Sequence, residues 1–364
     1  MRVVDAALHD AVAARLARDA DLQRVGLADR AAVRRAVARA LAAEGVVAAP
    51  ARWAALVREL VDEHAGLGPL ETLLRDPDVT DVCCNGPDEV WVERAGRLER
   101  TAVRFAGHDH LRAVLDRVVG AAGARLDRTH PWVDAVLPGG VRLHALLPPL
   151  ADNVTVTLRR VPATVPSWDE FVARGSLDTV GVAVLREVVR GRRNLVVCGP
   201  AGVGKTTLLA RLLGDVGTDR VVIVQDAPEL AHPAPHSVHL HVRPQSPDGV
   251  GGVDVRTLVR NALRMRPDRI VVGEVRGPEA ADLLAAMNTG HHGSATTVHA
   301  NAAADAVTRL AGMALQAGLP PSAVEAQLAT AVDVVVAMVR DGPHRRVERV
   351  LGNAGSGAPE VLWP

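Results

Sequence analysis

Three patterns of hydrophobic and polar positions follow one another along the chain. Over residues 1–65, apolar residues such as Leu8, Val12 and Leu16 recur at helical spacing among many Ala and Arg residues, so this segment is predicted to be helical. A charged amphipathic segment of this kind usually forms a solvated cap on the next domain. Docking of a partner protein is the alternative interpretation.

Short β-type runs dominate the next part of the chain, residues 66–160, and turn residues such as Asn85-Gly86-Pro87 separate them. The pattern predicts one helix over residues 109–119 and strands over 79–82, 89–94, 132–137, 141–147 and 154–160. We therefore expect a small α+β domain. Prolines and small polar residues from Pro162 to Pro166 then indicate a linker, placed at residues 161–175.

Buried strands and helices alternate through residues 176–364. Strands are predicted over 194–198, 221–225 and 270–272, and helices from Lys205, near 254–264 and from Pro278. This alternation is typical of an α/β domain with a parallel sheet and helices on both faces. Two further β-runs, 332–339 and 346–351, flank Asp341-Gly342 and predict a hairpin. The tail beyond Asn353 is expected to be loose.

Composition narrows the class of protein. The 364 residues are 48% hydrophobic and 23% charged, as in folded proteins, and 42 basic residues balance 42 acidic ones. A neutral balance gives no reason to expect nucleic acid as a direct partner. Asp5 and Asp10 argue against a secretory signal, three cysteines cannot form a spaced disulfide framework, and no apolar run reaches about 18 residues. We expect a cytoplasmic protein without a transmembrane segment.

The strongest chemical signal is a phosphate-binding loop, which directly follows a hydrophobic strand and opens a helix. In such loops, glycines let backbone N–H groups surround a phosphate, Lys reaches the β- and γ-phosphates, and Thr offers its hydroxyl to Mg²⁺. Lys205 is the only lysine of the chain; Arg occupies every other cationic position apart from the histidines. The residues predicted to bind nucleotide here are Gly199, Pro200, Ala201, Gly202, Val203, Gly204, Lys205, Thr206 and Thr207.

Further segments resemble the motifs of one family in family order. Ile270-Val-Val-Gly-Glu274-Val-Arg276 looks like a Walker B segment, Val221 to Glu229 an Asp box, and Thr289 to Ala300 a His box. In the first half, Val141-Arg142, Pro148-Pro149 and Val154 to Arg160 match the pattern that leads into the linker. The chain from about Val79 to Leu351 thus resembles the type II/type IV secretion ATPases.

This resemblance implies a RecA-like P-loop domain behind the α+β domain, a homohexamer, ATP and Mg²⁺ as cofactors, and inner-membrane platform proteins as partners at the inner face of the cytoplasmic membrane. It implies catalytic roles for Glu274, Glu229, His299 and Arg276, with either carboxylate able to orient water. Thr206 and Glu274 would serve the metal. Arg159 and Arg160 would reach the nucleotide from the N-terminal domain.

Three departures from the family pattern qualify the resemblance. Gln225 replaces the usual Glu of the Asp box, His292 replaces the usual Asp of the His box, and a four-Cys zinc insertion is missing. The last departure favours the tight-adherence pilus and conjugation-type branches. A motor for pilus assembly or secretion is the first expectation; a conjugation-type motor and a nucleotide-gated scaffold with little turnover are the alternatives.

Other clusters invite a metal interpretation. His236, His239 and His241 put two imidazoles on one strand face, and His291-His292 adds a pair. Because no carboxylate or Cys ligand stands at a suitable spacing, we expect satisfied or surface histidines. Cys83-Cys84 is expected to pack in the core as small hydrophobic residues.

Overall fold

The computed structural model describes residues 6–25, 29–161, 164–230, 234–243, 245, 250–342, 344–356 and 359–364. The chain forms two compact units, Met1–Val161 and Pro162–Pro364, and each is presented by itself. Asp5 and the linker residues Pro162 and Ala163 lie outside the described residues.

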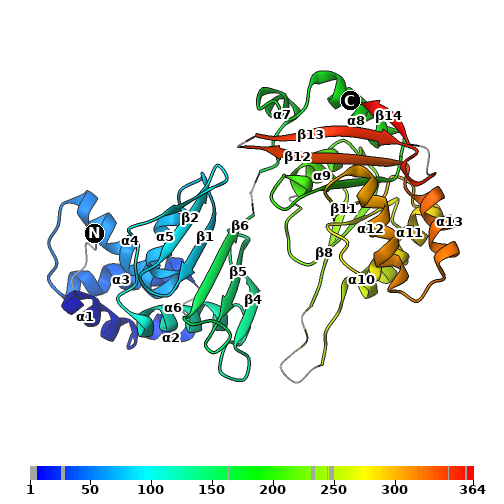
Figure 1. Ribbon diagram of the computed structural model, residues 1–364. Helices are drawn as coiled ribbons and strands as arrows, with labels where there is room; N and C mark the ends of the chain where they lie inside the picture. Colours follow the sequence, from blue (N-terminus) through cyan, green and yellow to red (C-terminus); the bar gives the residue numbers. More distant parts are fainter. Residues whose placement is uncertain are drawn as a thin grey trace. The chain divides into compact units, whose positions relative to one another are not determined.

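The first unit begins with helices, as the spacing of apolar residues predicts (Figure 1). Asp29 caps α3 by accepting from the amides of Ala31 and Ala32. Ala36 and Ala40 of α3 are small, and α3 packs through this stripe into a cluster with Leu56 and Leu60 of α4. The helices of this part are α1 (Ala6–Leu16), α2 (Ala20–Val25), α3 (Arg30–Ala43) and α4 (Pro50–Ala65).

A six-stranded antiparallel sheet, in the order β3-β2-β1-β6-β5-β4, completes the first unit. One face packs on α6 through Leu111, Val114 and Leu115. The opposite face carries exposed or half-exposed side chains, among them Trp132 and Arg159. The elements are η1 (Gly68–Leu70), α5 (Glu71–Leu74), β1 (Val79–Asn85), β2 (Val90–Arg94), β3 (Arg97–Arg100), α6 (His108–Ala121), β4 (Trp132–Val136), β5 (Val141–Leu146) and β6 (Thr155–Arg160).

A buried carboxylate links the helices of this unit to the segment that leads into its sheet. Asp62 of α4 is 4% exposed and pairs with Arg75 and, at 2.9 Å, with Arg30, which also binds Glu71 at 2.8 Å. Burial raises the pKa of Asp62, although the arginines oppose the shift. The predicted helical segment and α+β domain are therefore parts of one compact unit.

The second unit is the expected α/β domain. Its eight-stranded sheet has the order β14-β13-β12-β7-β11-β10-β8-β9, with parallel pairing from β12 to β9. The elements are α7 (Trp168–Ala173), α8 (Thr179–Arg190), β7 (Leu195–Gly199), α9 (Lys205–Leu213), β8 (Val221–Gln225), β9 (Ser237–His241), α10 (Val255–Ala262), β10 (Arg269–Val272), α11 (Glu279–Asn288), β11 (Ala295–His299), α12 (Ala303–Leu315), α13 (Pro321–Ala331), β12 (Val334–Asp341), β13 (His344–Gly352), η2 (Ala354–Ser356) and β14 (Glu360–Trp363).

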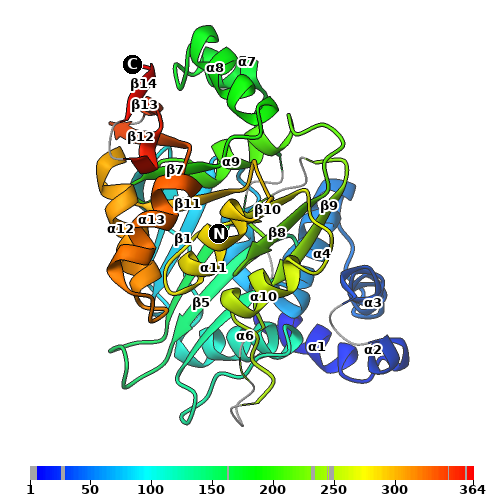
Figure 2. The ribbon, with the colours of Figure 1, turned by 90° about the vertical axis from the view of Figure 1, so that its right-hand side faces the viewer.

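Both faces of this sheet are covered, which explains its near-continuous hydrophobic strands. Along β7, Leu195 and Val197 join the core shared with α8 and α9, whereas Val196 and Cys198 join the core shared with α10–α13. Figure 2 shows α10 to α13 grouped together, with α8 and α9 at another side of the strands. The central strands therefore lie between two helical layers.

Two expectations about the ends of this unit are wrong. The tail beyond Asn353 is not loose, because β14 pairs with β13 and Trp363 Nε1 donates to Asp178 Oδ1 at 3.0 Å. The expected linker runs too far, because a capping box formed by Ser167 and Glu170 starts α7 within it. Trp168 of α7 is 6% exposed and packs in the core of the second unit.

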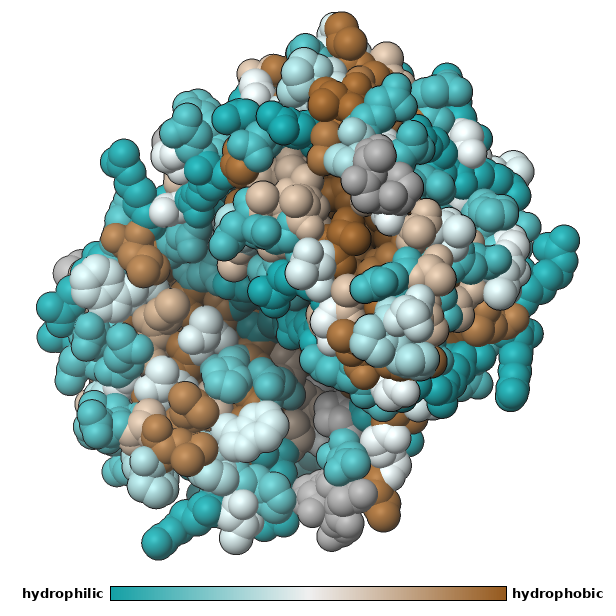
Figure 3. Space-filling view, turned by 45° about the vertical axis from the view of Figure 1, so that its right-hand side comes forward, coloured by the Kyte–Doolittle hydropathy of each residue, from teal (hydrophilic) through white to brown (hydrophobic). Residues whose placement is uncertain are grey.

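Exposed large hydrophobic side chains include Val47, Leu98, Trp132 and Val180. Figure 3 shows a largely hydrophilic surface on the face in view, broken by smaller hydrophobic groups. Within the described residues, no helix combines the length and hydropathy needed to cross a membrane.

Candidate active site

The phosphate-loop residues follow β7 and end at α9, as the motif predicts. A methyl group on Gly199 would collide with the carbonyl oxygen of Met338, and Gly204 caps α9 at φ 97°, so both positions favour glycine. The ammonium of Lys205 donates to the carbonyl oxygens of Gly199 (3.0 Å) and Pro200 (2.8 Å). Lys205 is thus held inside the loop, at the N-terminus of a helix, where the backbone favours anions.

A chain of polar contacts links Lys205 to Glu274. Lys205 Nζ lies 3.3 Å from Nδ1 of His299, whose Nε2 lies 3.1 Å from Glu274 Oε1. Since an ammonium only donates, the contacts fit a neutral His299 that accepts at Nδ1 and donates from Nε2. Burial, together with Lys205, lowers the pKa of His299, although Glu274 opposes the shift, which favours this neutral form.

Burial and neighbouring charges act in opposite directions on the pKa values of Lys205 and Glu274. Burial lowers the pKa of Lys205, and the charge of Glu274 partly restores it. Burial disfavours the charged form of Glu274, but Arg276, His299 and Lys205 together bring its pKa below the ordinary value. Glu274 is therefore ionised at neutral pH despite being only 22% exposed.

Sheet topology explains why these residues meet. Gly199, Glu274 and His299 end or follow neighbouring parallel strands, β7, β10 and β11. The carboxyl ends of parallel strands share one edge of a sheet, which is where ligands of open α/β sheets bind.

Arg276 forms the outer part of the site. Its Nε lies 3.0 Å from Glu274 Oε1 and its Nη1 3.8 Å from Asp226 Oδ2. Buried Glu279 accepts from the backbone amides of Arg276 (2.6 Å) and Gly277 (2.8 Å) and so fixes this turn. A cleft of about 370 Å³ opens here, lined by Asp226, Val242, Asp254, Val255, Arg256, Glu274, Arg276, Gly277, Pro278 and Glu279.

Our sequence interpretation missed Glu279. Its position one residue after Pro278, in the first turn of α11, is a signal that could have identified it. Glu279 acts on Arg276 through the backbone and is a positioning residue.

Glu229 lies near the site but is less central. Its charge raises the pKa of both Lys205 and Arg276, in each case as a smaller contribution than that of Glu274. The loop that carries Glu229 is held by Gln225, which is 4% exposed and whose Oε1 accepts from the amides of Glu229 and Leu230, both at 3.1 Å. Gln225 Nε2 also lies 3.2 Å from His239 Nδ1. The amide at this departure from the family pattern therefore shapes the loop.

Gln225→Ala is expected to lower the free energy of unfolding by about 2–3 kcal/mol, because two backbone amides lose their acceptor. Urea denaturation with an unchanged m-value would measure this loss. Gln225→Glu retains an oxygen acceptor and is the control, with an expected change under about 1 kcal/mol. Equal losses in both variants would contradict the role of Oε1.

His292, the second departure from the family pattern, lies at the end of β11 opposite His299. His291 and His292 precede β11, where His291 Nδ1 contacts the Pro267 carbonyl at 3.1 Å and His292 is exposed. His299 ends the same strand. With about 3.3 Å per residue, five strand residues separate His292 from the phosphate loop by more than a side chain can reach.

The predicted nucleotide contacts Arg159 and Arg160 lie in the first unit, whereas the phosphate loop lies in the second. Arg159 is 63% exposed and its Nε donates to Asp81 at 2.8 Å. Arg160 is half-buried and donates to the carbonyl of Leu74. Arg160 thus anchors β6 to α5. The side chain of Arg159 is more exposed and is the better candidate to contact a ligand.

The residues present fit a magnesium nucleotide. Mg²⁺ prefers oxygen ligands and retains waters. Thr206 directly follows Lys205 at the start of α9, is half-buried and carries a hydroxyl. Together with the Glu274 carboxylate, it offers the oxygen donors that such a metal requires.

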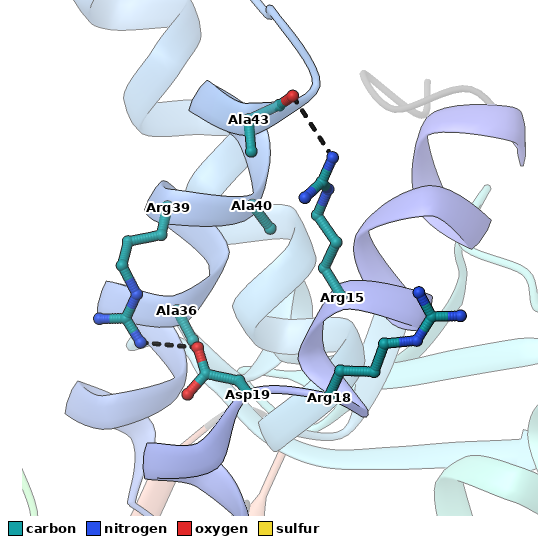
Figure 4. Close-up of a pocket in the computed structure, with 7 residues that line it drawn as sticks. All are labelled: Arg15, Arg18, Asp19, Ala36, Arg39, Ala40 and Ala43. Atoms are coloured by element: carbon teal, nitrogen blue, oxygen red, sulfur yellow. Dashed lines mark hydrogen bonds and ion pairs between the residues drawn. The ribbon is translucent and has the colours of Figure 1, made fainter.

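Other candidate sites have simpler explanations. A hollow of about 270 Å³ lies in the first unit between the end of α1, the turn that follows it and α3 (Figure 4), but Arg15 pairs there with Glu44, and Arg39 with Asp19 at 2.6 Å. Among the described residues, no three His, Cys, Asp or Glu side chains are arranged to hold a metal ion. Cys84 is buried as expected, Cys83 is half-buried, and burial raises the pKa of both thiols.

Comparisons with known proteins agree with this geometry. Residues 63–352 match the family described as type II/IV secretion system protein. The chain is 47% identical over 299 residues to a "putative conjugal transfer protein" of Mycobacterium tuberculosis (strain CDC 1551/Oshkosh), covering 80% of this chain and 85% of that one. It is 32% identical over 330 residues to the type IV secretion system protein VirB11 of Brucella suis biovar 1, covering 81% and 91%.

The fold also matches a crystal structure of the pilus retraction motor PilT with bound ADP. The TM-score is 0.56 at 21% identity, over 81% of this chain and 82% of that one. Sequence motifs, sheet topology and the extent of the family match lead to the same conclusion. The chain belongs to the type II/IV secretion system protein family, whose members include secretion ATPases.

Proposed function

We propose that this chain is a Mg²⁺-dependent ATPase that works as a ring of six identical subunits in a secretion or transfer system. The observation that carries the proposal is the chain of contacts from Lys205 through His299 to Glu274 at the carboxyl edge of the sheet. Binding of ADP by PilT, which shares the fold, supports a nucleotide as the ligand.

Each residue has a part in hydrolysis that follows from its charge and position. Phosphoryl transfer to water depends on placement and on charge stabilisation more than on covalent steps. Lys205 offers its positive charge to the β- and γ-phosphates. Glu274 is ionised and orients the attacking water. His299 contacts both Lys205 and Glu274 and detects the γ-phosphate. Arg276 keeps Glu274 in place.

Thr206 and Glu274 would hold Mg²⁺, the latter through water. A bound metal ion neutralises part of the phosphate charge. Loss of hydrolysis on chelation with EDTA, and its return on addition of Mg²⁺, tests this part of the proposal.

The names of the relatives bear on what the motor moves. Both relatives described above carry names from conjugal transfer or type IV secretion, which favours the conjugation-type alternative over pilus assembly. Work at the inner face of the cytoplasmic membrane, with membrane platform proteins as partners, fits this role. Neighbouring genes would separate the alternatives, since pilin genes would favour a pilus and a relaxase gene would favour DNA transfer.

The ring has its own test. We expect light scattering, with Mg²⁺ and a non-hydrolysable ATP analogue, to detect a species of six 38.3 kDa chains. Specific activity should rise with protein concentration, because a closed ring of identical interfaces forms by association. Arg159→Ala should reduce turnover, because it removes an exposed guanidinium group that we expect to reach the nucleotide. A monomer with full activity at high dilution would refute the ring.

Steady-state hydrolysis tests the motor itself. Turnover in the assembled protein is expected, with a kcat in the ordinary enzyme range of about 1 s⁻¹ or above. Nucleotide binding without measurable turnover would instead identify a nucleotide-gated scaffold.

A further inference from the structure

Two arginines lie beside the phosphate loop on the side away from Glu274. Strand β12 pairs in parallel with β7 from Val334 to Ala337 and then continues past the end of β7. Its later residues therefore run along the phosphate loop. Arg340 of β12 lies directly opposite Arg345 of β13 in the hairpin, so the hairpin brings two guanidinium groups to the same place.

Distances place both side chains against the loop. A methyl group on Gly202 would lie 4.0 Å from Nη1 of Arg340, and one on Gly204 would lie 4.0 Å from Cδ of Arg345. Both arginines are half-buried. They are thus within reach of the space above the loop glycines.

Neither guanidinium is neutralised by the described part of the chain. Arg340 Nε donates to the carbonyl oxygen of Gly342 at 3.1 Å, and no ion pair joins Arg340 or Arg345 to a described carboxylate. Like charges directly opposite each other in a β-ladder are unfavourable. The positive end of α9 and Lys205 add to this repulsion. An anion at the loop would relieve it.

We propose that Arg340 and Arg345 form a clamp that binds the phosphate chain of the nucleotide from within the same subunit. This inference rests on the proposed function and adds a second set of phosphate ligands to it. A guanidinium fork forms paired hydrogen bonds with phosphate oxygens, which Lys205 as a point charge cannot do.

The order of strands identifies which phosphates the clamp binds. Strand β12 lies on one side of β7, while β11 and β10, which carry His299 and Glu274, lie on the other. The clamp therefore approaches the phosphates opposite the hydrolytic carboxylate and contacts those that ATP and ADP share. Contacts of this kind stabilise the ground state and the transition state equally, so they change KM but not kcat.

The experiment measures affinity and turnover in Arg340→Ala, Arg345→Ala and the double variant. Each single change is expected to weaken binding of ADP and of a non-hydrolysable ATP analogue about tenfold, and by equal factors. KM for ATP should rise similarly, with kcat within about threefold of wild type. Pyrophosphate, as a competitor of fluorescent ADP, should lose affinity by the same factor, because the clamp contacts phosphate and not the base.

Controls separate charge, geometry and folding. Arg346→Ala is matched, because Arg346 neighbours Arg345 on the same strand but points to the other face and is exposed; its ADP affinity should equal that of wild type. Arg345→Lys should restore only part of the affinity. Circular dichroism and thermal melting confirm that each variant is folded.

The outcomes distinguish the clamp from the proposed function. Unchanged ADP affinity in a folded double variant would overturn the clamp, and so would a fall in kcat at constant KM. If Lys205→Ala loses nucleotide while the arginine variants retain it, the clamp fails and the proposed function stands. A wild-type protein that binds no nucleotide would overturn both.

Discussion

Lys205→Ala is expected to abolish ATP hydrolysis and to weaken nucleotide binding at least about a hundredfold, which is about 3 kcal/mol. Lys205 is the only lysine of the chain, and its ammonium is held inside the loop by two carbonyl oxygens and His299. The substitution removes the one compact cation that fits there. Single-turnover hydrolysis and titration with fluorescent ADP would measure both effects.

The fold should survive this substitution. Burial lowers the pKa of Lys205, so its charge is unfavourable to the folded state, and we expect thermal melting within a few degrees of wild type. Lys205→Arg is the informative control, because it keeps the charge but replaces a point charge by a planar fork. It should also be inactive. Hydrolysis at the wild-type rate in folded Lys205→Ala would overturn the assignment of the phosphate loop.

The second unit was largely predictable because its signals are local. A strand, a glycine loop and a helix follow one another in sequence around Lys205, so spacing alone identified that loop. The meeting of Glu274 with His299 followed from a simple rule, since both residues end or follow neighbouring parallel strands. Their roles stay predictions, but their proximity needed only the α/β pattern.

The features that the sequence did not reveal depend on contacts between distant segments. The sequence pattern around Trp168 suggested a linker, but its indole Nε1 donates to Asp215 at 2.7 Å, 47 residues away. Trp363 likewise reaches Asp178. The approach of Arg340 and Arg345 to the phosphate loop depends on the pairing of β12 with β7. Pairing of this kind is set by tertiary packing, which local propensity cannot specify.

The departures from the family pattern show how structure changes an interpretation. Gln225 and His292 are the two substitutions within the family motifs. Gln225 proves to hold a loop through its carbonyl oxygen, and His292 lies at the amino end of β11, away from the site. In the described part of the chain, the hydrogen bonds of Gln225 go to His239, Glu229 and Leu230 and not to Lys205 or Glu274.

Glu274 and Glu229 are the two candidate acids for orienting the attacking water, and a matched pair of variants distinguishes them. Glu274 accepts from His299 and binds Arg276 through both carboxylate oxygens, at 3.0 and 3.1 Å. The charge of Glu229 raises the pKa of Lys205 less than the charge of Glu274 does. We therefore propose that Glu274 orients the attacking water.

Glu274→Gln is expected to keep ATP bound within about threefold of the wild-type affinity, because the amide retains the size and one acceptor oxygen. Its kcat should fall about a hundredfold or more, since loss of a positioned base usually reduces rates by that amount. Glu229→Gln should change kcat about tenfold at most, because the charge of Glu229 acts on Lys205 and Arg276 more weakly than that of Glu274. Single-turnover hydrolysis with Mg²⁺, beside equilibrium titration with a non-hydrolysable analogue, separates chemistry from binding. If Glu229→Gln stalls hydrolysis while Glu274→Gln does not, the roles of the two carboxylates are exchanged, and Glu274 serves to hold Arg276 and His299 in place.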